Sequence, residues 1–240
     1  MAGGAYVALS GLRSRAEHLE RLASDIANAD TAGYKATRST TVVAERPTFA
    51  QALASAVDVA AGPQRIDFRA GSAVTTGRDL DFAIEGPGFF VVRTPYGDRY
   101  TRNGHFTRAA DGTLTTPDGD PVLGADGPLR LPAGPIEVGE GGEIRSGDTV
   151  VGHPRVVQFA DPHGLAREEG ARFRAPAGTA PEVETDANLR AGMLEESNVS
   201  VIERMAQLTE LSRTFESLQR GLSVLMNDMD GRAIVELGRR

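Results

Sequence analysis

Apolar residues near the start of the chain recur with the spacing of a heptad. They are separated alternately by three and four positions: Leu9, Leu12, Ala16, Leu19, Ala23 and Ile26. This spacing places one apolar seam along a helix. Residues 27–33 follow the seam, and their Asn, Asp and Gly content favours turns over helix. We therefore predict an N-terminal helix over residues 1–30.

The C-terminal end carries a second seam of the same kind, formed by Leu208, Leu211, Phe215, Leu218, Leu222, Leu225 and Met229. Ser200 and Glu203 have the spacing of a capping box, in which each side chain satisfies a backbone N–H at the helix start. An isolated helix with such a seam is marginal in water. The sequence therefore predicts that the N- and C-terminal helices pair as a coiled-coil stalk. Packing of both helices on the middle of the chain, as ordinary core helices, is the alternative.

Between the two ends the period changes to that of short strands. Leu80, Phe82 and Ile84 alternate with Asp81 and Ala83, which predicts a strand with one buried face. Residues 89–92 are all apolar and predict a buried strand. Dipeptides that tolerate the positive φ angles of tight turns recur every seven or eight residues: Asn103-Gly104, Asp111-Gly112, Asp118-Gly119 and Asp126-Gly127. We predict a mainly β central domain of antiparallel strands at residues 66–190.

Residues 31–65 contain few large apolar side chains and many Thr, Ala and Ser. They predict a flexible linker, in which Phe49, Leu53 and Val57 have the spacing of one short helix. The C-terminal helix then takes residues 191–240. The predicted organisation is a helix, a linker, a β domain and a second helix.

Composition narrows the classes of function. The 240 residues carry 33 acidic and 26 basic side chains, a formal net charge of −7, and Lys35 is the only lysine. The acidic balance argues against nucleic acid as a partner, because that affinity comes from clustered cations. Cysteine is absent, which excludes disulfides and thiolate metal sites. No apolar run is long enough for direct membrane insertion. No basic residue precedes the short apolar start, so a cleaved secretion signal is not expected.

Motifs of catalysis are not found in the sequence. None of the four histidines forms the i, i+4 pair of a helical metal site. Gly86-Pro87-Gly88 begins like a dinucleotide-binding loop, but the third glycine is missing and a strand follows. We predict no catalytic residues, no cofactor and no metal, hence no enzyme. A peptidoglycan-processing enzyme remains an alternative, and it would require convergent carboxylates in a cleft.

Four segments, residues 24–35, 79–90, 100–106 and 194–199, together resemble the motifs of one family, the bacterial flagellar rod, hook and hook-associated proteins. Residues 24–35 are similar to the segment that closes the first helix in that family. Residues 79–90, 100–106 and 194–199 are similar to three further motifs, in the family's order. The resemblance runs from about residue 6 to 230. Four ordered motifs make it more specific than any catalytic fragment.

The resemblance implies an axial structural subunit of the flagellar basal-body rod that transmits torque for motility. It implies a place in the periplasmic space, after export without a cleaved signal peptide by the flagellar type III export apparatus. The implied partners are other flagellar rod proteins and copies of the chain itself. The chain is more similar to proximal-rod members, with distal-rod or hook-type members second. A soluble helical export adaptor is the remaining alternative.

The residues expected at interfaces lie on the two seams and in the turn after the first helix. Their expected role is contact between helices and subunits. They are Leu9, Leu12, Leu19, Ile26, Asn28, Gly33, Leu208, Leu211, Phe215, Leu218, Leu222 and Leu225.

Overall fold

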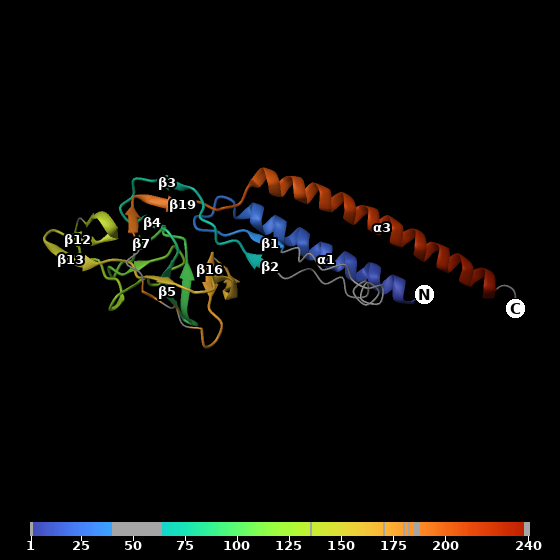
Figure 1. The fold of residues 1–240 in the computed structure, drawn as a ribbon, viewed down its shortest axis with the longest axis horizontal. Helices are drawn as coiled ribbons and strands as arrows, with labels where there is room; N and C mark the ends of the chain where they lie inside the picture. The colour runs from blue at the N-terminus through green and yellow to red at the C-terminus, as the bar shows by residue number, and fades with distance from the viewer. Residues whose placement is uncertain are drawn as a thin grey trace. The chain divides into compact units, whose positions relative to one another are not determined.

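The computed structural model of the chain comprises two compact units (Figure 1). Unit 1 contains Met1–Ala27, Thr37–Arg65 and Ser200–Arg240, and unit 2 contains Asn28–Ala36 and Ile66–Val199. The structure describes residues 2–39, 64–134, 136–169, 171–179, 181, 183–184 and 188–237.

Two helices dominate unit 1, α1 (Ala2–Ala27) and α3 (Val201–Leu237), and they contact each other. Strand β1 (Thr37–Ser39) forms a two-stranded sheet with β2 (Gln64–Ile66). Helix α3 begins directly after the predicted cap residue Ser200, whose hydroxyl accepts a hydrogen bond from the backbone N–H of Glu203 at 3.4 Å. The helix predicted over residues 191–240 therefore starts later than expected, because residues 193–195 form a strand. Within the described residues, no helix has the length and apolarity needed to cross a membrane.

The prediction that the terminal helices pair as a coiled-coil stalk is wrong. Most elements of the chain are strands in small sheets, and no described side chain of α3 is buried. On α1, Leu22 and Asp25 are buried, whereas Ala23 of the predicted seam is exposed. The buried face is therefore offset from the heptad. The reason is that Asp25 forms an ion pair with Arg204 at 3.3 Å, which a pattern of apolar residues does not reveal.

Most of the predicted linker, residues 40–63 with Phe49, Leu53 and Val57, lies outside the described residues. Its early part, residues 33–36, is described and buried in unit 2. The backbone of Ala36 explains this, since its N–H donates to the Asn198 side chain at 2.7 Å and its carbonyl accepts from the Asp67 N–H at 2.8 Å.

Unit 2 is built from short antiparallel strands. A six-stranded sheet has the order β15-β16-β6-β5-β14-β17, and β3 pairs with β19 and β4 with β18. Three further small sheets are β9-β10, β7-β8 and β11-β12-β13. The strands are β3 (Ala73–Thr75), β4 (Phe82–Glu85), β5 (Phe89–Thr94), β6 (Gly97–Thr101), β7 (Thr107–Arg108), β8 (Leu114–Thr115), β9 (Leu123–Gly124), β10 (Gly127–Pro128), β11 (Glu137–Val138), β12 (Ile144–Ser146), β13 (Thr149–Gly152), β14 (Val156–Gln158), β15 (Ala166–Glu168), β16 (Arg172–Arg174), β17 (Val183–Glu184), β18 (Asn188–Ala191) and β19 (Met193–Glu195), with 3₁₀ turns η1 (Glu140–Gly142) and η2 (Pro162–Gly164).

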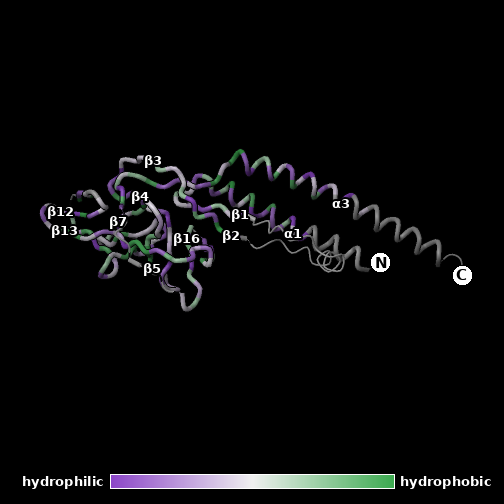
Figure 2. Tube along the Cα trace, in the orientation of Figure 1, coloured by the Kyte–Doolittle hydropathy of each residue, from purple (hydrophilic) through white to green (hydrophobic). Residues whose placement is uncertain are grey.

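Strand β5 is buried on both faces, as its apolar run predicts. Phe90 and Val92 point into one hydrophobic cluster, and Phe89 and Val91 point into a second. The alternation follows from the pleat of a strand, which sends successive side chains to opposite faces. Figure 2 shows hydrophobic residues gathered along this part of the chain. The core of unit 2 therefore has two halves separated by one strand.

The strand that begins near Leu80 departs from the prediction of one buried face at two residues, because Asp81 and Ala83 are both buried. Phe82 and Ile84 are buried as expected, but Asp81 is buried too, because its carboxylate bonds the His105 ring at 2.8 Å. Two predicted turn dipeptides do lie where paired strands are connected. Asp111-Gly112 lies between β7 and β8, and Asp126 precedes Gly127, the first residue of β10, in the connection from β9. Gly104 has another role: a Cβ there would lie 1.8 Å from the carbonyl oxygen of Phe82.

Phe106 provides a test of this core, since it is fully buried and packs edge-on against Phe90 with ring centroids 5.2 Å apart. We expect Phe106→Ala to lower the free energy of unfolding by about 3–5 kcal/mol, because it leaves a cavity. Urea unfolding of the full chain, followed by circular dichroism, measures the change. Tyr96→Ala, at an exposed turn, should change it by less than about 0.5 kcal/mol. Equal losses in the two variants would contradict the described core.

Candidate functional site: a buried charge network

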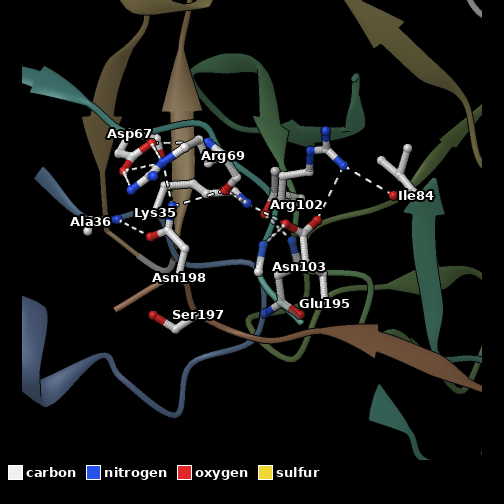
Figure 3. A network of polar contacts seen from close by, with 12 residues as sticks. Lys35, Ala36, Asp67, Arg69, Ile84, Arg102, Asn103, Glu195, Ser197 and Asn198 are labelled. Carbon is white, nitrogen blue, oxygen red and sulfur yellow. Dashed lines mark hydrogen bonds and ion pairs between the residues drawn. The ribbon is translucent and has the colours of Figure 1, made fainter. Parts of the chain in front are cut away.

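The single lysine of the chain lies in the interior of unit 2 (Figure 3). The Lys35 side chain is 0% exposed. Its ammonium donates to the carboxylate of Glu195 and to the backbone carbonyl of Arg69 at 2.9 Å. An unpaired ammonium in such a place would be strongly destabilising. The position of Lys35 is therefore dictated by these two acceptors.

Glu195, at the end of β19, is the centre of the network. One carboxylate oxygen accepts from Lys35 and from the backbone N–H of Gly71 at 3.0 Å. The other oxygen accepts from the guanidinium of Arg102 at 3.2 Å. The backbone carbonyl of Glu195 also accepts from the N–H of Gly33 at 2.7 Å. One residue thus connects three other segments of the chain.

Arg102 extends the network to the segment after β4. Its guanidinium donates to the carbonyl of Ile84 at 3.3 Å and to the carbonyl of Gly86 at 2.6 Å. The planar fork of an arginine suits several acceptors at once. Arg102 follows β6 directly, so the end of that strand is anchored to the β4–β5 connection.

Asn198 closes the network on the other side. Its side-chain oxygen accepts from the N–H of Ala36 at 2.7 Å, and its amide nitrogen donates to the carbonyls of Asp67 at 2.7 Å and Arg69 at 3.0 Å. The backbone N–H of Asn198 donates to the carbonyl of Tyr34 at 3.3 Å. The segment after β19 is thereby held against residues 34–36.

The backbone before Lys35 is fixed by close packing. Gly33 has φ +68°, and a Cβ there would lie 2.2 Å from the backbone nitrogen of Asn103. Glycine is therefore required on both steric and conformational grounds. Beside it, the Arg167 guanidinium lies 4.3 Å from the centroid of the Tyr34 ring and also donates to the carbonyl of Lys35.

Burial disfavours the charged form of both cations in the network, Lys35 and Arg102. It lowers the pKa of the Lys35 ammonium, and the attraction of Glu195 partly offsets this. Burial also lowers the pKa of the Arg102 guanidinium, again against the effect of Glu195. The carboxylate therefore compensates two desolvated cations, and the network depends on it.

The arrangement serves to hold several segments of the chain together. Its polar groups bond one another, and its carboxylate is occupied by three donors. Among the described residues, no group of three or more His, Asp or Glu side chains is placed to hold a metal ion. The network joins segments at 33–36, 67–71, 84–86, 102–103 and 195–198.

The structure places the predicted interface residues in two settings. Gly33 is buried in unit 2, and Asn28 is half-buried there, accepting from the Thr31 hydroxyl at 3.2 Å. Leu19, Ile26, Leu208, Leu211 and Phe215 are half-buried in unit 1. The side chains of Leu9, Leu12, Leu218, Leu222 and Leu225 lie outside the described residues. The structure therefore brings no continuous predicted seam together among the described side chains.

The charged residues of the network were not predicted as a site. Lys35, Arg102, Glu195 and Asn198 each lie in one of the quoted motifs. No local pattern links residues as distant in sequence as Ala36 and Asn198, which bond each other across 162 positions. One available signal is the lone lysine in a chain that otherwise uses arginine. The other is the order of the motifs themselves.

In unit 1 a smaller polar contact joins the two helices. Arg204 pairs with Asp25, donates to the carbonyl of Thr37 at 3.2 Å and to the Gln207 side chain at 2.9 Å. His18 lines the adjoining hollow of about 250 Å³. Burial, Arg21 and Arg204 together lower the pKa of His18 from 6.5.

The sequence matches two family models, and part of the network lies in the matched regions. Residues 83–146 match the model described as flagellar hook protein FlgE/F/G D1 domain, and residues 190–234 match flagellar basal body rod FlgEFG protein C-terminal. Arg102 lies in the first match and Glu195 in the second.

Curated relatives are similar over nearly the whole chain. Flagellar basal-body rod protein FlgF of Caulobacter vibrioides is 35% identical over 90% of both chains. FlgF of Rhizobium meliloti is 34% identical over 99% of both. Flagellar basal-body rod protein FlgG of Bacillus subtilis is 29% identical over 88% of this chain and 90% of its own.

Substitutions in the network should rank by the number of charges left unpaired. We expect Glu195→Gln to lower the free energy of unfolding by about 3–5 kcal/mol, because Lys35 and Arg102 both lose their carboxylate. Lys35→Met should cost less, since Glu195 keeps Arg102 and Gly71. Arg69→Gln, which breaks an exposed pair with Asp67, should cost at most about 1 kcal/mol. Urea unfolding measures the series, and a reversed order would contradict the central role of Glu195.

Acid should weaken unit 1 through His18. Its folded pKa lies below 6.5, so the unfolded chain binds the proton first and stability falls as pH drops below about 6.5. The neighbouring charges are Arg21 and Asp25 on α1, Arg38 on β1, and Glu203 and Arg204 on α3.

Thermal melts of the full chain at about pH 5 and about pH 7.5, followed by circular dichroism, measure this loss. His18→Gln should reduce the difference in melting temperature between the two pH values. The exposed His153→Gln should leave it unchanged. Identical pH dependence in wild type and His18→Gln would refute the assignment.

Proposed function

We propose a mechanical role on the premise that this chain belongs to the flagellar basal-body rod proteins. It is a structural subunit of the rod and assembles with other flagellar basal-body components. The observation that carries the mechanical role is the Lys35–Glu195–Arg102 network. It ties the segment that leaves α1 to the segment that enters α3, both within unit 2.

The tie suits a subunit that bears torsion. Residues 33–36 continue from the first helix, and residues 195–198 lead into the last one. Load applied along either segment meets buried ion pairs and backbone hydrogen bonds before it reaches the apolar core of unit 2. Such contacts resist displacement because separating them exposes unpaired charges in a low-dielectric interior.

The finer role that we propose is that of a proximal-rod subunit in the periplasmic space. It would reach this place through the flagellar type III export apparatus, without a cleaved signal peptide, and contact both other rod proteins and copies of itself. The resemblance of the sequence motifs to those of proximal-rod members supports the proximal placement.

The predicted interface residues of α3 are proposed contacts with neighbouring subunits. Leu208, Leu211 and Phe215 are half-buried within the single chain, so part of each apolar side chain remains in water. Contacts with a neighbour would remove that surface from water, at about 25 cal/mol per Å². The chain would then act through surface contacts and not through a reaction, which fits the names of its relatives.

Complementation of a gene deletion tests this role. We expect the deletion to abolish swimming, and Leu211→Asp to leave the strain non-motile because a charge enters the proposed contact. Thr209→Asp, at an exposed position of the same helix, should restore swimming. Soft-agar motility and immunoblots of secreted protein measure the outcome, and both variants should still be exported. A deletion strain that swims normally would overturn the proposed function.

A further inference from the structure

A small hollow in unit 1 is lined by more basic than acidic side chains. It holds about 250 Å³, and its lining comes from α1, β1 and the first turns of α3. Its charged and titratable lining consists of His18, Arg21, Asp25, Arg38, Glu203 and Arg204. Three guanidinium groups therefore stand against two carboxylates, whereas the whole chain carries a net charge of −7. The hollow is a locally basic site in an acidic protein.

Both carboxylates of the hollow already have partners within unit 1. Asp25 pairs with Arg204 at 3.3 Å, and Glu203 accepts from the Gln207 amide at 3.2 Å. The side chains of Arg204 and Asp25 are only 12% and 3% exposed, so this ion pair is a fixed part of the wall. The remaining charges are those of two arginines and one glutamate. The hollow therefore keeps a surplus of positive charge, which a small anion would balance.

His18 reports the sign of the electrostatic potential in the hollow. Burial lowers the pKa of His18 from 6.5, and the charges of Arg21 and Arg204 lower it further. All three effects act in one direction, so at His18 the arginines outweigh the carboxylates that line the same space. An anion placed beside the ring would act in the opposite direction, because a negative charge favours the imidazolium.

A fourth arginine lies on the same face of α1. Arg15 precedes His18 by three positions, and residues three apart are neighbours on a helix surface. One terminal nitrogen of the Arg15 guanidinium is buried and has no hydrogen-bond partner among the described residues. A buried donor without an acceptor is costly. This face of α1 therefore carries a donor for which the described part of the chain supplies no acceptor.

We propose that the hollow binds one oxyanion group, in contact with Arg21, Arg38 and His18. Planar guanidinium groups donate pairs of hydrogen bonds to the oxygens of a carboxylate, sulfate or phosphate group. The volume of about 250 Å³ lies below the range of about 300–1,000 Å³ that holds drug-sized ligands, so it suits a single such group. The group is either a dissolved ion or an acidic side chain of another subunit, since both present the same oxygens. The inference does not depend on the proposed function, because the whole lining belongs to one chain.

Anion binding and protonation of His18 must strengthen each other. The anion stabilises the imidazolium, and by linkage the imidazolium tightens anion binding by the same factor. The charges that face His18 are those of Arg21 and Asp25 on α1, Arg38 on β1, and Glu203 and Arg204 on α3. The arginines stay charged throughout, so His18 is the cation that changes near neutral pH. The acid-induced loss of stability expected through His18 should therefore shrink when the anion is bound.

Sulfate is a suitable probe, because it stays a dianion across the pH range in which histidine changes its charge. Isothermal titration calorimetry of the full chain with sodium sulfate, at constant ionic strength, measures the affinity. We expect saturable binding of one ion per chain, about fivefold tighter at about pH 5.5 than at about pH 8. By NMR, the pKa of His18 should rise when sulfate is added, and His18→Gln identifies the signal that disappears.

Matched variants separate the site from general attraction of anions. Arg38→Gln, at an exposed position, and Arg21→Gln should each weaken sulfate binding by about tenfold, as expected for the loss of one charge-assisted hydrogen bond. Arg13→Gln, on the same helix with a side chain 83% exposed, should leave the affinity unchanged. His18→Gln should remove the pH dependence. Equal weakening by Arg13→Gln and Arg38→Gln would overturn the proposal, as would binding that is independent of pH.

Acetate distinguishes the two sources of the oxyanion group. Tighter binding of sulfate than of acetate, lost in Arg38→Gln, assigns the hollow to a dissolved inorganic oxyanion. Tighter binding of acetate, lost in the same variant, assigns it to an acidic side chain of another subunit. Either result supports an oxyanion site. If neither ion binds the full chain more tightly than chloride does, the hollow is not such a site and the proposal fails.

Discussion

The carboxylate of Glu195 accepts hydrogen bonds from Lys35, Arg102 and Gly71 inside unit 2, and the donors come from three separate segments of the chain. Lys35 and Glu195 are 160 positions apart. Taking each charge out of water costs several kcal/mol, which is recovered only when every partner is in place. The arrangement is therefore stable as a whole and unfavourable in part. This all-or-none character makes the start and the end of unit 2 depend on each other, while the apolar clusters on either side of β5 stabilise the strands between them.

The network uses its two kinds of cation for different tasks. The chain has 26 basic residues, and 25 of them (26 − 1) are arginine. Arg102 has a planar fork that serves two backbone carbonyls as well as Glu195, which suits a junction between strands. Lys35 delivers a compact charge on a flexible stem, so it fits between Glu195 and the carbonyl of Arg69 without exposing any of its side chain. A guanidinium at position 35 would bring more donors than the two acceptors, Glu195 and the Arg69 carbonyl, that bond the Lys35 ammonium.

Local chemistry explains which parts of the fold could be predicted. The buried strand at residues 89–92 and the turns at Asp111 and Asp126 depend on neighbours in sequence, and the sequence contains that information. The coiled coil failed because period alone does not identify the buried face: Asp25 occupies it through Arg204 while Ala23 is exposed. No spacing of apolar residues predicts the charge network, because its ion pairs join segments that are distant in the sequence. Gly33 was expected at an interface, but its buried place against Asn103 follows from a backbone approach that no pattern of residue types encodes.

Different interactions stabilise the two units. Unit 2 contains two buried apolar clusters and a buried network of paired charges, whereas the described part of α3 has no buried side chain, and Ile202 is 85% exposed. Helical stability in proteins comes mainly from packing of an apolar face. A long helix whose described side chains are at most half-buried therefore gains little stability from contacts within its own chain. On the proposed role, neighbouring subunits provide the missing packing, and association then stabilises the helix by mass action. On this role, α3 gains its full packing only within the assembly.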